Sequence, residues 1–434
     1  MTSLASPAPS PATHAYGGRR IDPLFSLVLI YYWLVQFIGP TNPFGLADGQ
    51  LYILFIGPMA LYAIFMLLQM LLNRRPLDRE VWVLVALLAI VSMASVLRTD
   101  RETIQTIGMM CLVIAGVFQQ RVTISASLVN LLFLASIPIG FLFYLRGWSP
   151  YSVLPSFASI TDLSWRVSVF PAIASGAFFA LIVLFTNLFY RNALGRAFCL
   201  PLAAYFLLFS GLRTAIFAAL LAGIYLIARR FGWMSSNFGR VAFFTLVVAF
   251  FSLSIFSSEQ LAQLPILGND FIRSLIVRDS AGFEATALGD QVFSAAIRGW
   301  MIEQHWNLIA ENPLFGVGTF DFQQLNTGYE FFDKFSGGTE AYLTGLIARI
   351  GLPALLLLFA IFARRWPVID GREDLARTVK LVLFLAMITY GSFIVPYDFI
   401  FLLMLIAVGN GYLDGRVRFA PRSGQIAGLP VQTA

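Results

Sequence analysis

The sequence predicts an all-α integral membrane protein with about twelve transmembrane helices and one large, partly helical periplasmic loop. Its composition is the first observation: 58% of the residues are hydrophobic and only 12% are charged, whereas soluble domains carry about 25% charged residues. Apolar runs of membrane-spanning length, near 20 residues, recur along the chain. One long hydrophilic stretch, roughly residues 257–338, interrupts them.

The elements are expected in the following order. Residues 1–20 are rich in Pro, Ala and Ser and are expected to form a disordered cytoplasmic tail. Residues 21–256 hold apolar runs at roughly 22–39, 50–72, 81–97, 104–119, 124–145, 168–190, 197–211, 213–228 and 241–256. After the loop at 257–338, residues 339–413 hold runs at 339–362, 378–396 and 398–413, and residues 414–434 form a second tail. The weakest divisions are Ser210–Arg213, which fits a break within one helix, and the "VPYD" between the last two runs.

The distribution of Lys and Arg predicts that both termini lie in the cytoplasm and the large loop in the periplasm. In this orientation the inner segments hold 19 of the 29 Lys and Arg residues. The net charge of +6 is spread over short segments, so it does not indicate nucleic-acid binding. Cys111 and Cys199 lie within apolar runs and are expected to be buried thiols.

Arginine dominates the basic residues on the predicted outer face. Lys334 is joined there by Arg98, Arg101, Arg146, Arg166, Arg213, Arg273, Arg278 and Arg298. A general preference for Arg over Lys explains this pattern, and so does an anionic ligand, because guanidinium pairs bidentately with phosphate oxygens. Arg213 is the sharpest case, in "SGLRTAIFAALL", because a charge within hydrocarbon costs at least about 2.5 kcal/mol unless it is paired or hydrated. An arginine that reaches the membrane surface is the alternative interpretation of Arg213.

The loop sequence "RGWMIEQHWNLIAENP" predicts a helix with Arg298 and His305 on one face. The helix should end at Asn312, because a residue before proline disfavours the α region. His305 is a candidate base, since its ordinary pKa is near neutrality, or a structural hydrogen-bonding histidine. The following "GVG" predicts a tight turn in which backbone can approach a ligand.

At the end of the loop, Thr339 is a candidate N-cap for the next helix, with Glu340 in its first turn. Glu340 either pairs with the helix dipole or serves as a general base. No zinc spacing, phosphate-binding loop, dinucleotide fingerprint or nucleophile elbow is found in the sequence.

The order of these motifs resembles the O-antigen polymerase/ligase family of bacterial envelope proteins. The similar elements are the Arg-x-Trp helix, "NPLFGVGTF", "TEAYLTGLIARIGLPALLLLF" and the upstream "SGLRTAIFAALL". The expected topology, with one large periplasmic loop, extends the resemblance over the whole chain.

The resemblance implies glycosyl transfer at the periplasmic face of the bacterial inner membrane, without a metal or other cofactor. The donor would be a glycan on undecaprenyl pyrophosphate, and the acceptor another lipid-linked repeat unit or lipid A core. Arg213 and Arg298, with Arg273 and Arg278, would bind the pyrophosphate as negative charge develops. Glu340 or His305 would deprotonate the acceptor hydroxyl. Membrane lipid, a flippase and a chain-length regulator are the other partners implied.

The resemblance also bears on the choice between polymerase and ligase. Glu340 lies where ligases commonly have a His–Asn pair, which favours a polymerase for O-antigen, capsule or exopolysaccharide. A ligase that attaches the finished glycan to lipid A core or protein is the first alternative. A polytopic transporter or flippase is the alternative from another class, but such proteins usually contain related halves, and no internal repeat is seen here. A structural subunit of an envelope assembly is a further alternative.

Overall fold

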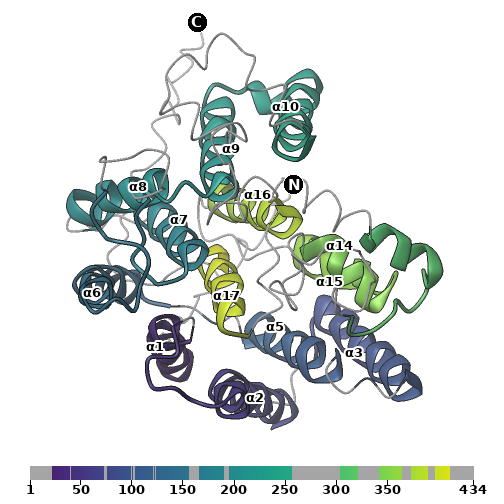
Figure 1. The fold of residues 1–434 in the computed structure, drawn as a ribbon. Helices are drawn as coiled ribbons and strands as arrows, with labels where there is room; N and C mark the ends of the chain where they lie inside the picture. The colour runs from purple at the N-terminus through teal and green to yellow at the C-terminus, as the bar shows by residue number, and fades with distance from the viewer. Residues whose placement is uncertain are drawn as a thin grey trace, which may run out of the picture.

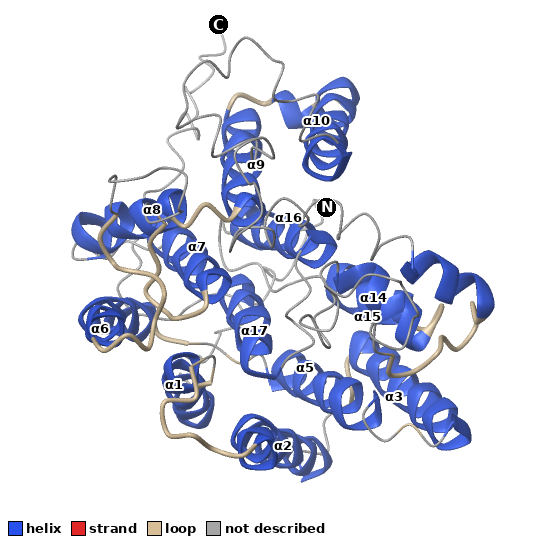
Figure 2. Ribbon diagram, in the orientation of Figure 1, coloured by secondary structure: helices blue, strands red, loops and turns tan. Residues whose placement is uncertain are grey.

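The computed structural model describes residues 22–39, 41–72, 76–98, 100, 103–120, 122, 124–155, 166–189, 195–256, 304–320, 342–363, 373–389 and 396–410. Within these ranges the chain is built of helices, and extended pairing is limited to an isolated bridge between Ser152 and Val167 (Figure 2). The helices are α1 (Pro23–Ile38), α2 (Asp48–Leu72), α3 (Arg79–Arg98), η1 (Ile104–Gly108), α5 (Met109–Gln120), α6 (Ala126–Leu145), α7 (Ile173–Phe189), η2 (Gly195–Cys199), α8 (Leu200–Phe209), α9 (Arg213–Arg230), η3 (Trp233–Ser235), α10 (Asn237–Phe256), residues 304–311, α14 (Tyr342–Ile350), α15 (Ala354–Ala363), α16 (Glu373–Thr389) and α17 (Pro396–Asn410).

Each apolar run predicted from the sequence contains a described helix, which confirms the all-α class. Among the described residues, three helical segments are long and apolar enough to cross a membrane. Each is 20 residues long: Ile53–Leu72, Arg79–Arg98 and Ala126–Leu145. Further apolar helices of 10–17 residues accompany them. Their composition is that of an integral membrane protein.

Helix α17 lies at the centre of the bundle, with α1, α2, α5, α7 and α16 around it (Figure 1). Its residues from Phe399 to Val408 are at most 2% exposed. A helix that is apolar on every side is suited either to a protein core or to lipid, and the burial of α17 shows that other helices enclose it. The core of the bundle therefore forms around this last helix.

Several polar contacts hold the helices in register. Asn130 of α6 and Asn187 of α7 exchange two buried side-chain hydrogen bonds of 2.9 and 2.7 Å. Pro58 lacks the N–H that would bond the carbonyl of Leu54 within α2, and the Tyr31 hydroxyl of α1 donates to that carbonyl at 2.8 Å. The proline thus leaves an acceptor that a neighbouring helix uses.

The uncertain division at Ser210–Arg213 is a sharp break between two helices. Helix α8 ends at Phe209, Gly211 adopts a φ of +63°, and α9 begins at Arg213. The Ser210 hydroxyl donates to the Leu207 carbonyl at 2.7 Å and accepts from the Leu212 N–H at 3.1 Å. Beyond the break, α9 packs against α16, whereas α8 packs against α7.

The predicted run 339–362 differs from the structure, which divides it into α14 and α15. Gly351 has a φ of +71°, and Pro353 cannot donate a backbone hydrogen bond, so the helix ends at Ile350 and restarts at Ala354. Arg349, which falls within the predicted run 339–362, lies in the last turn of α14 next to this break.

Helices α3 and α15 pack against each other in opposite directions. The guanidinium of Arg79, at the start of α3, lies 5.7 Å from the ring centre of Phe359 in α15. At the other end of α3, Arg98 contacts residues that also adjoin the break between α14 and α15. The end of α3 and the end of α14 are therefore neighbours. Cys111 and Cys199 are buried free thiols, as predicted.

Candidate functional site

The described part of the large loop is a helix at 304–311 and the turn that follows it, residues 312–320, which we name the glycine turn. The helix ends at Asn312, as the following proline predicts. Figure 1 shows this unlabelled green helix beside α14. The Gly316 N–H donates to the Asn312 carbonyl at 2.8 Å and closes the turn.

The glycine turn binds to the carboxyl end of α14. The N–H groups of Val317 and Gly318 donate to the carbonyls of Ala348 and Arg349, at 2.8 and 2.9 Å. The last carbonyls of a helix have no donors within it, and here the N–H groups of the turn are the donors. In return, the Leu352 N–H after the break donates to the Pro313 carbonyl at 2.9 Å. The sequence predicts that the "GVG" backbone can approach a ligand. In the structure this backbone contacts α14.

The turn requires glycine at positions 316 and 318. Their φ angles are +67° and +86°, in the left-handed region that other residues rarely adopt. A Cβ at position 316 would clash with the backbone of Arg349, and one at position 318 with the Asp100 carboxylate. The two glycines are therefore needed for packing within the chain, where the turn meets Arg349 and Asp100.

The segment after α3 forms the other side of this contact. The Arg98 guanidinium donates to the Gly316 carbonyl. The Asp100 carboxylate accepts from the N–H of Thr319 at 2.6 Å and from its hydroxyl at 2.9 Å. It also accepts from the Thr103 N–H at 3.1 Å, and the hydroxyls of Thr103 and Thr319 lie 3.1 Å apart. We name this set of contacts the Asp100 clamp.

The Asp100 clamp favours the ionised carboxylate. Burial of Asp100 would raise its pKa, but the hydrogen bonds from Thr103 and Thr319 outweigh burial and hold the pKa below its usual range. Asp100 therefore carries its negative charge at neutral pH. That charge strengthens each hydrogen bond it accepts.

His305 joins the loop helix to α14 on the other side of the glycine turn. Its side chain is 0% exposed, and its Nδ1 lies 2.9 Å from the Thr344 hydroxyl. Its ring packs edge-on against Phe320 at 5.6 Å, and the Arg349 guanidinium lies 5.5 Å from the centre of that same ring. The loop helix, the glycine turn and α14 thus share one buried aromatic and cationic cluster.

The surroundings of His305 keep its imidazole neutral. Burial, and then the positive charge of Arg349, lower the pKa of His305 to about 4. A neutral imidazole is a suitable hydrogen-bond partner for Thr344. It is a weaker base than a histidine with an ordinary pKa.

Most of the other predicted site residues lie outside the described residues: Arg273, Arg278, Arg298 and Glu340. The backbone of Arg213 is described, and it is the first residue of α9. A neighbouring segment reaches the same break, because the Val167 N–H donates to the Phe209 carbonyl at 3.0 Å. Arg166, just before it, is buried with 6% of its surface exposed.

Sequence reasoning missed the functions of Arg98 and Asp100. Arg98 counts among the outer arginines of the sequence and Asp100 is not singled out there, and their contacts with the glycine turn span 218 and 219 residues of sequence. A local signal was present at Asp100, because an Asp three residues before Thr103 matches an N-cap of the following helix. Thr319, the partner of Asp100 in the loop, has no such signal in its sequence.

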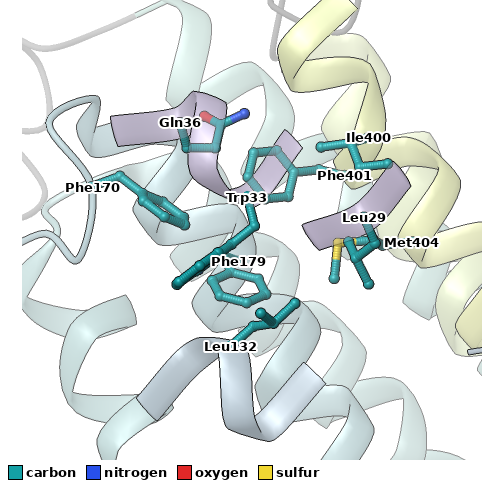
Figure 3. A pocket seen from close by; sticks show the side chains of 9 residues that line it. All are labelled: Leu29, Trp33, Gln36, Leu132, Phe170, Phe179, Ile400, Phe401 and Met404. Carbon is teal, nitrogen blue, oxygen red and sulfur yellow. The ribbon is translucent and has the colours of Figure 1, made fainter. Parts of the chain in front are cut away.

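An apolar crevice lies elsewhere, between α1, α6, α7 and α17 (Figure 3). Gln36 adds one polar side chain to its lining of Leu29, Trp33, Leu132, Phe170, Phe179, Ile400, Phe401 and Met404. None of these is a predicted site residue. Among the described residues, no group of three or more His, Cys, Asp and Glu side chains is placed to hold a metal ion.

Residues 197–359 match the model of a family described as O-antigen ligase. The matched region begins before the break at Ser210, includes the glycine turn and α14, and ends within α15. It confirms the resemblance to the O-antigen polymerase/ligase family that the motifs indicate, and it does not separate polymerase from ligase. No curated protein matches the chain.

Proposed function

We propose that this protein, in which residues 197–359 match the O-antigen ligase family, is a polysaccharide polymerase of the bacterial inner membrane. It would transfer a glycan from a polyprenyl pyrophosphate carrier to the hydroxyl of another lipid-linked repeat unit at the periplasmic face. One observation carries the proposal: a single family match includes the Arg213 break, the glycine turn and the approach to α14. All the proposed site residues lie within this matched region.

The reaction would proceed as a substitution at the anomeric carbon. The acceptor oxygen forms a bond to that carbon while the bond to the pyrophosphate oxygen breaks. Arg213 and Arg298 would bind the departing pyrophosphate as its negative charge grows, with Arg273 and Arg278 as further cations of the same loop. The acceptor proton passes to a carboxylate or imidazole base.

We assign the base to Glu340 and a positioning role to His305. The buried His305 is hydrogen-bonded to Thr344, and its lowered pKa makes it a weak proton acceptor. Glu340 lies just before α14 in the sequence, where ligases commonly have a His–Asn pair. The carboxylate at this position supports a polymerase, and a ligase remains the second candidate because the matched family is described by that activity.

A strain lacking this gene, complemented with variants, tests the proposal through its surface glycan. With Arg213→Ala or Glu340→Gln, we expect single repeat units to accumulate, and His305→Gln should retain more polymer than Glu340→Gln. Arg146→Ala is the matched control, because Arg146 is an exposed arginine at the end of α6.

The lipid-linked products separate the candidate functions. Full-length polymer that stays on its lipid carrier would identify a ligase. Polymer of normal length and attachment in the deletion strain would exclude both activities. Repeat units retained on the cytoplasmic side would indicate transport instead.

A further inference from the structure

We propose that Asp100 is a positioning residue, which acts on the reacting groups by holding the glycine turn between the ends of α3 and α14. This inference rests on the proposed function, because the residues it positions are the candidate pyrophosphate-binding and base residues. Nothing in the sequence motifs of the loop points to Asp100. The contact is carried by hydrogen bonds that only the folded chain brings together.

The backbone of Asp100 is held by α3. Its N–H donates to the Ser95 carbonyl at 2.9 Å, beyond the last turn of that helix. The carboxylate then faces Thr103 on one side and Thr319 on the other. Three donors on one carboxylate fix both its position and its rotation. Asp100 is therefore an anchor on the helical bundle and not part of the loop.

Thr319 transmits this anchor to the glycine turn. Both its N–H and its hydroxyl donate to Asp100, so the residue cannot rotate without losing a bond. The preceding Gly318 sits so close to the carboxylate that a side chain there would clash with it. The Arg98 guanidinium holds the other end of the turn at the Gly316 carbonyl.

The glycine turn transmits the anchor to α14. The bonds from Val317 and Gly318 to the carbonyls of Ala348 and Arg349 fix the carboxyl end of this helix. The contact between His305 and Thr344 joins the first turn of α14 to the loop helix. The end of α3 is therefore connected to α14 through the glycine turn, and α14 in turn contacts the loop helix.

The positions of α14 and of the loop helix matter for the reaction, because the candidate reacting groups precede these two helices in the sequence. In the sequence, Glu340 stands two residues before the start of α14 and Arg298 six residues before the loop helix at 304–311. A small error in the placement of either helix changes the separation of base and leaving-group cations. Misplacement of about 1 Å, caused by a mutation far from the chemistry, can cost about 100-fold in rate.

The test uses purified full-length protein in nanodiscs, with lipid-linked repeat units extracted from the deletion strain as substrate. For Asp100→Asn, we expect turnover per folded molecule to fall by about 10- to 100-fold with little change in KM. Thr319→Val should have a similar effect, and the double variant should be no worse than the poorer single variant. Glu311→Gln is the control, because Glu311 is an exposed carboxylate at the end of the loop helix at 304–311.

Each outcome decides a separate question. An inactive wild type with its own substrate would contradict the proposed function and not the clamp. An active wild type with Asp100→Asn turning over at the same rate per folded molecule would overturn the positioning role, even if less protein folds. Multiplied losses in the double variant would also overturn it, because independent effects multiply and a shared contact does not. Faster amide exchange of residues 312–320 in Asp100→Asn would support it.

Discussion

The core around α17 and the Asp100 clamp are held together by different forces. From Phe399 to Val408, α17 is enclosed by apolar side chains, and its stability depends on the van der Waals packing of these side chains, because lipid is as apolar as they are. The clamp depends on a few directional hydrogen bonds and on two glycines with positive φ. Burial is non-directional, so the core should accept changes of shape that preserve volume. Directional bonds do not accept such changes.

The core and the Asp100 clamp are also expected to affect different properties, stability for the core and activity for the clamp. The core holds most of the buried apolar side chains of the described residues. The clamp buries little surface, but it connects α3, the glycine turn and α14. We therefore expect core substitutions to change how much protein folds, and clamp substitutions to change what each folded molecule does.

Gly318→Ala should have the largest effect on activity. The substitution places a methyl group against the Asp100 carboxylate and forces a φ of +86°, which costs a non-glycine residue about 1–2 kcal/mol. We expect activity per folded molecule to fall by more than about 100-fold. Gly223→Ala in α9, where a Cβ meets no atom within 4 Å, is the control and should keep full activity. An active Gly318→Ala variant would show that the turn adapts.

Leu402→Ala tests the other region. Leu402 is 0% exposed in α17, and a large-to-small change at such a site costs about 2–5 kcal/mol in the free energy of unfolding. Leu402→Met should cost less than about 1.5 kcal/mol, because it preserves volume. Both are measured by denaturant titration in mixed micelles. A loss of turnover per folded molecule in Leu402→Ala would break the separation between the two regions.

The sequence predicts the helices, but neither the central position of α17 nor the Asp100 clamp. Apolar runs identify helices one at a time, and each predicted run contains a helix. The run 339–362 was taken as continuous because its composition stays apolar through Gly351 and Pro353. Gly351 and Pro353 break it, and the glycine turn then bonds the last carbonyls of α14. A run of hydropathy reports neither the backbone conformation nor a distant partner.

The same limit applies to the site. "NPLFGVGTF" was recognised as a motif, and its helix end at Asn312 was predicted correctly from Pro313. The reason for its glycines lies in Asp100 and Arg349, which sequence spacing cannot place beside them. His305 was left open between base and structural residue. Its burial, its bond to Thr344 and the charge of Arg349 are all tertiary properties.

His305 makes the loop contact sensitive to acid. In the unfolded chain its pKa is near 6.5, and in the fold it is lowered to about 4. Above pH 6.5 the histidine is neutral in both states and adds no pH dependence. As the pH falls from 6.5 toward 4, the unfolded chain binds a proton that the fold does not, so stability falls by about 3 kcal/mol in total.

His305→Gln should flatten the dependence of unfolding free energy on pH within this window. His14→Gln is the matched control, since His14 is the other histidine of the chain, and should leave the dependence as in the wild type. A wild-type curve that is flat between pH 6.5 and 4 would show that the imidazole is solvated. The glycine turn would then be held by Asp100 and Arg98 without His305.

The smallest expected effect lies on the apolar side, at a directional bond within the bundle. Tyr31→Phe removes the donor to the Leu54 carbonyl, which Pro58 leaves without its helical partner. We expect a loss of about 1 kcal/mol in the free energy of unfolding. In a Pro58→Ala background, the N–H restored at position 58 can bond that carbonyl itself, so Tyr31→Phe should cost less. Equal losses in both backgrounds would mean that the hydroxyl contributes through packing, and that the bundle depends on burial even at its polar contacts.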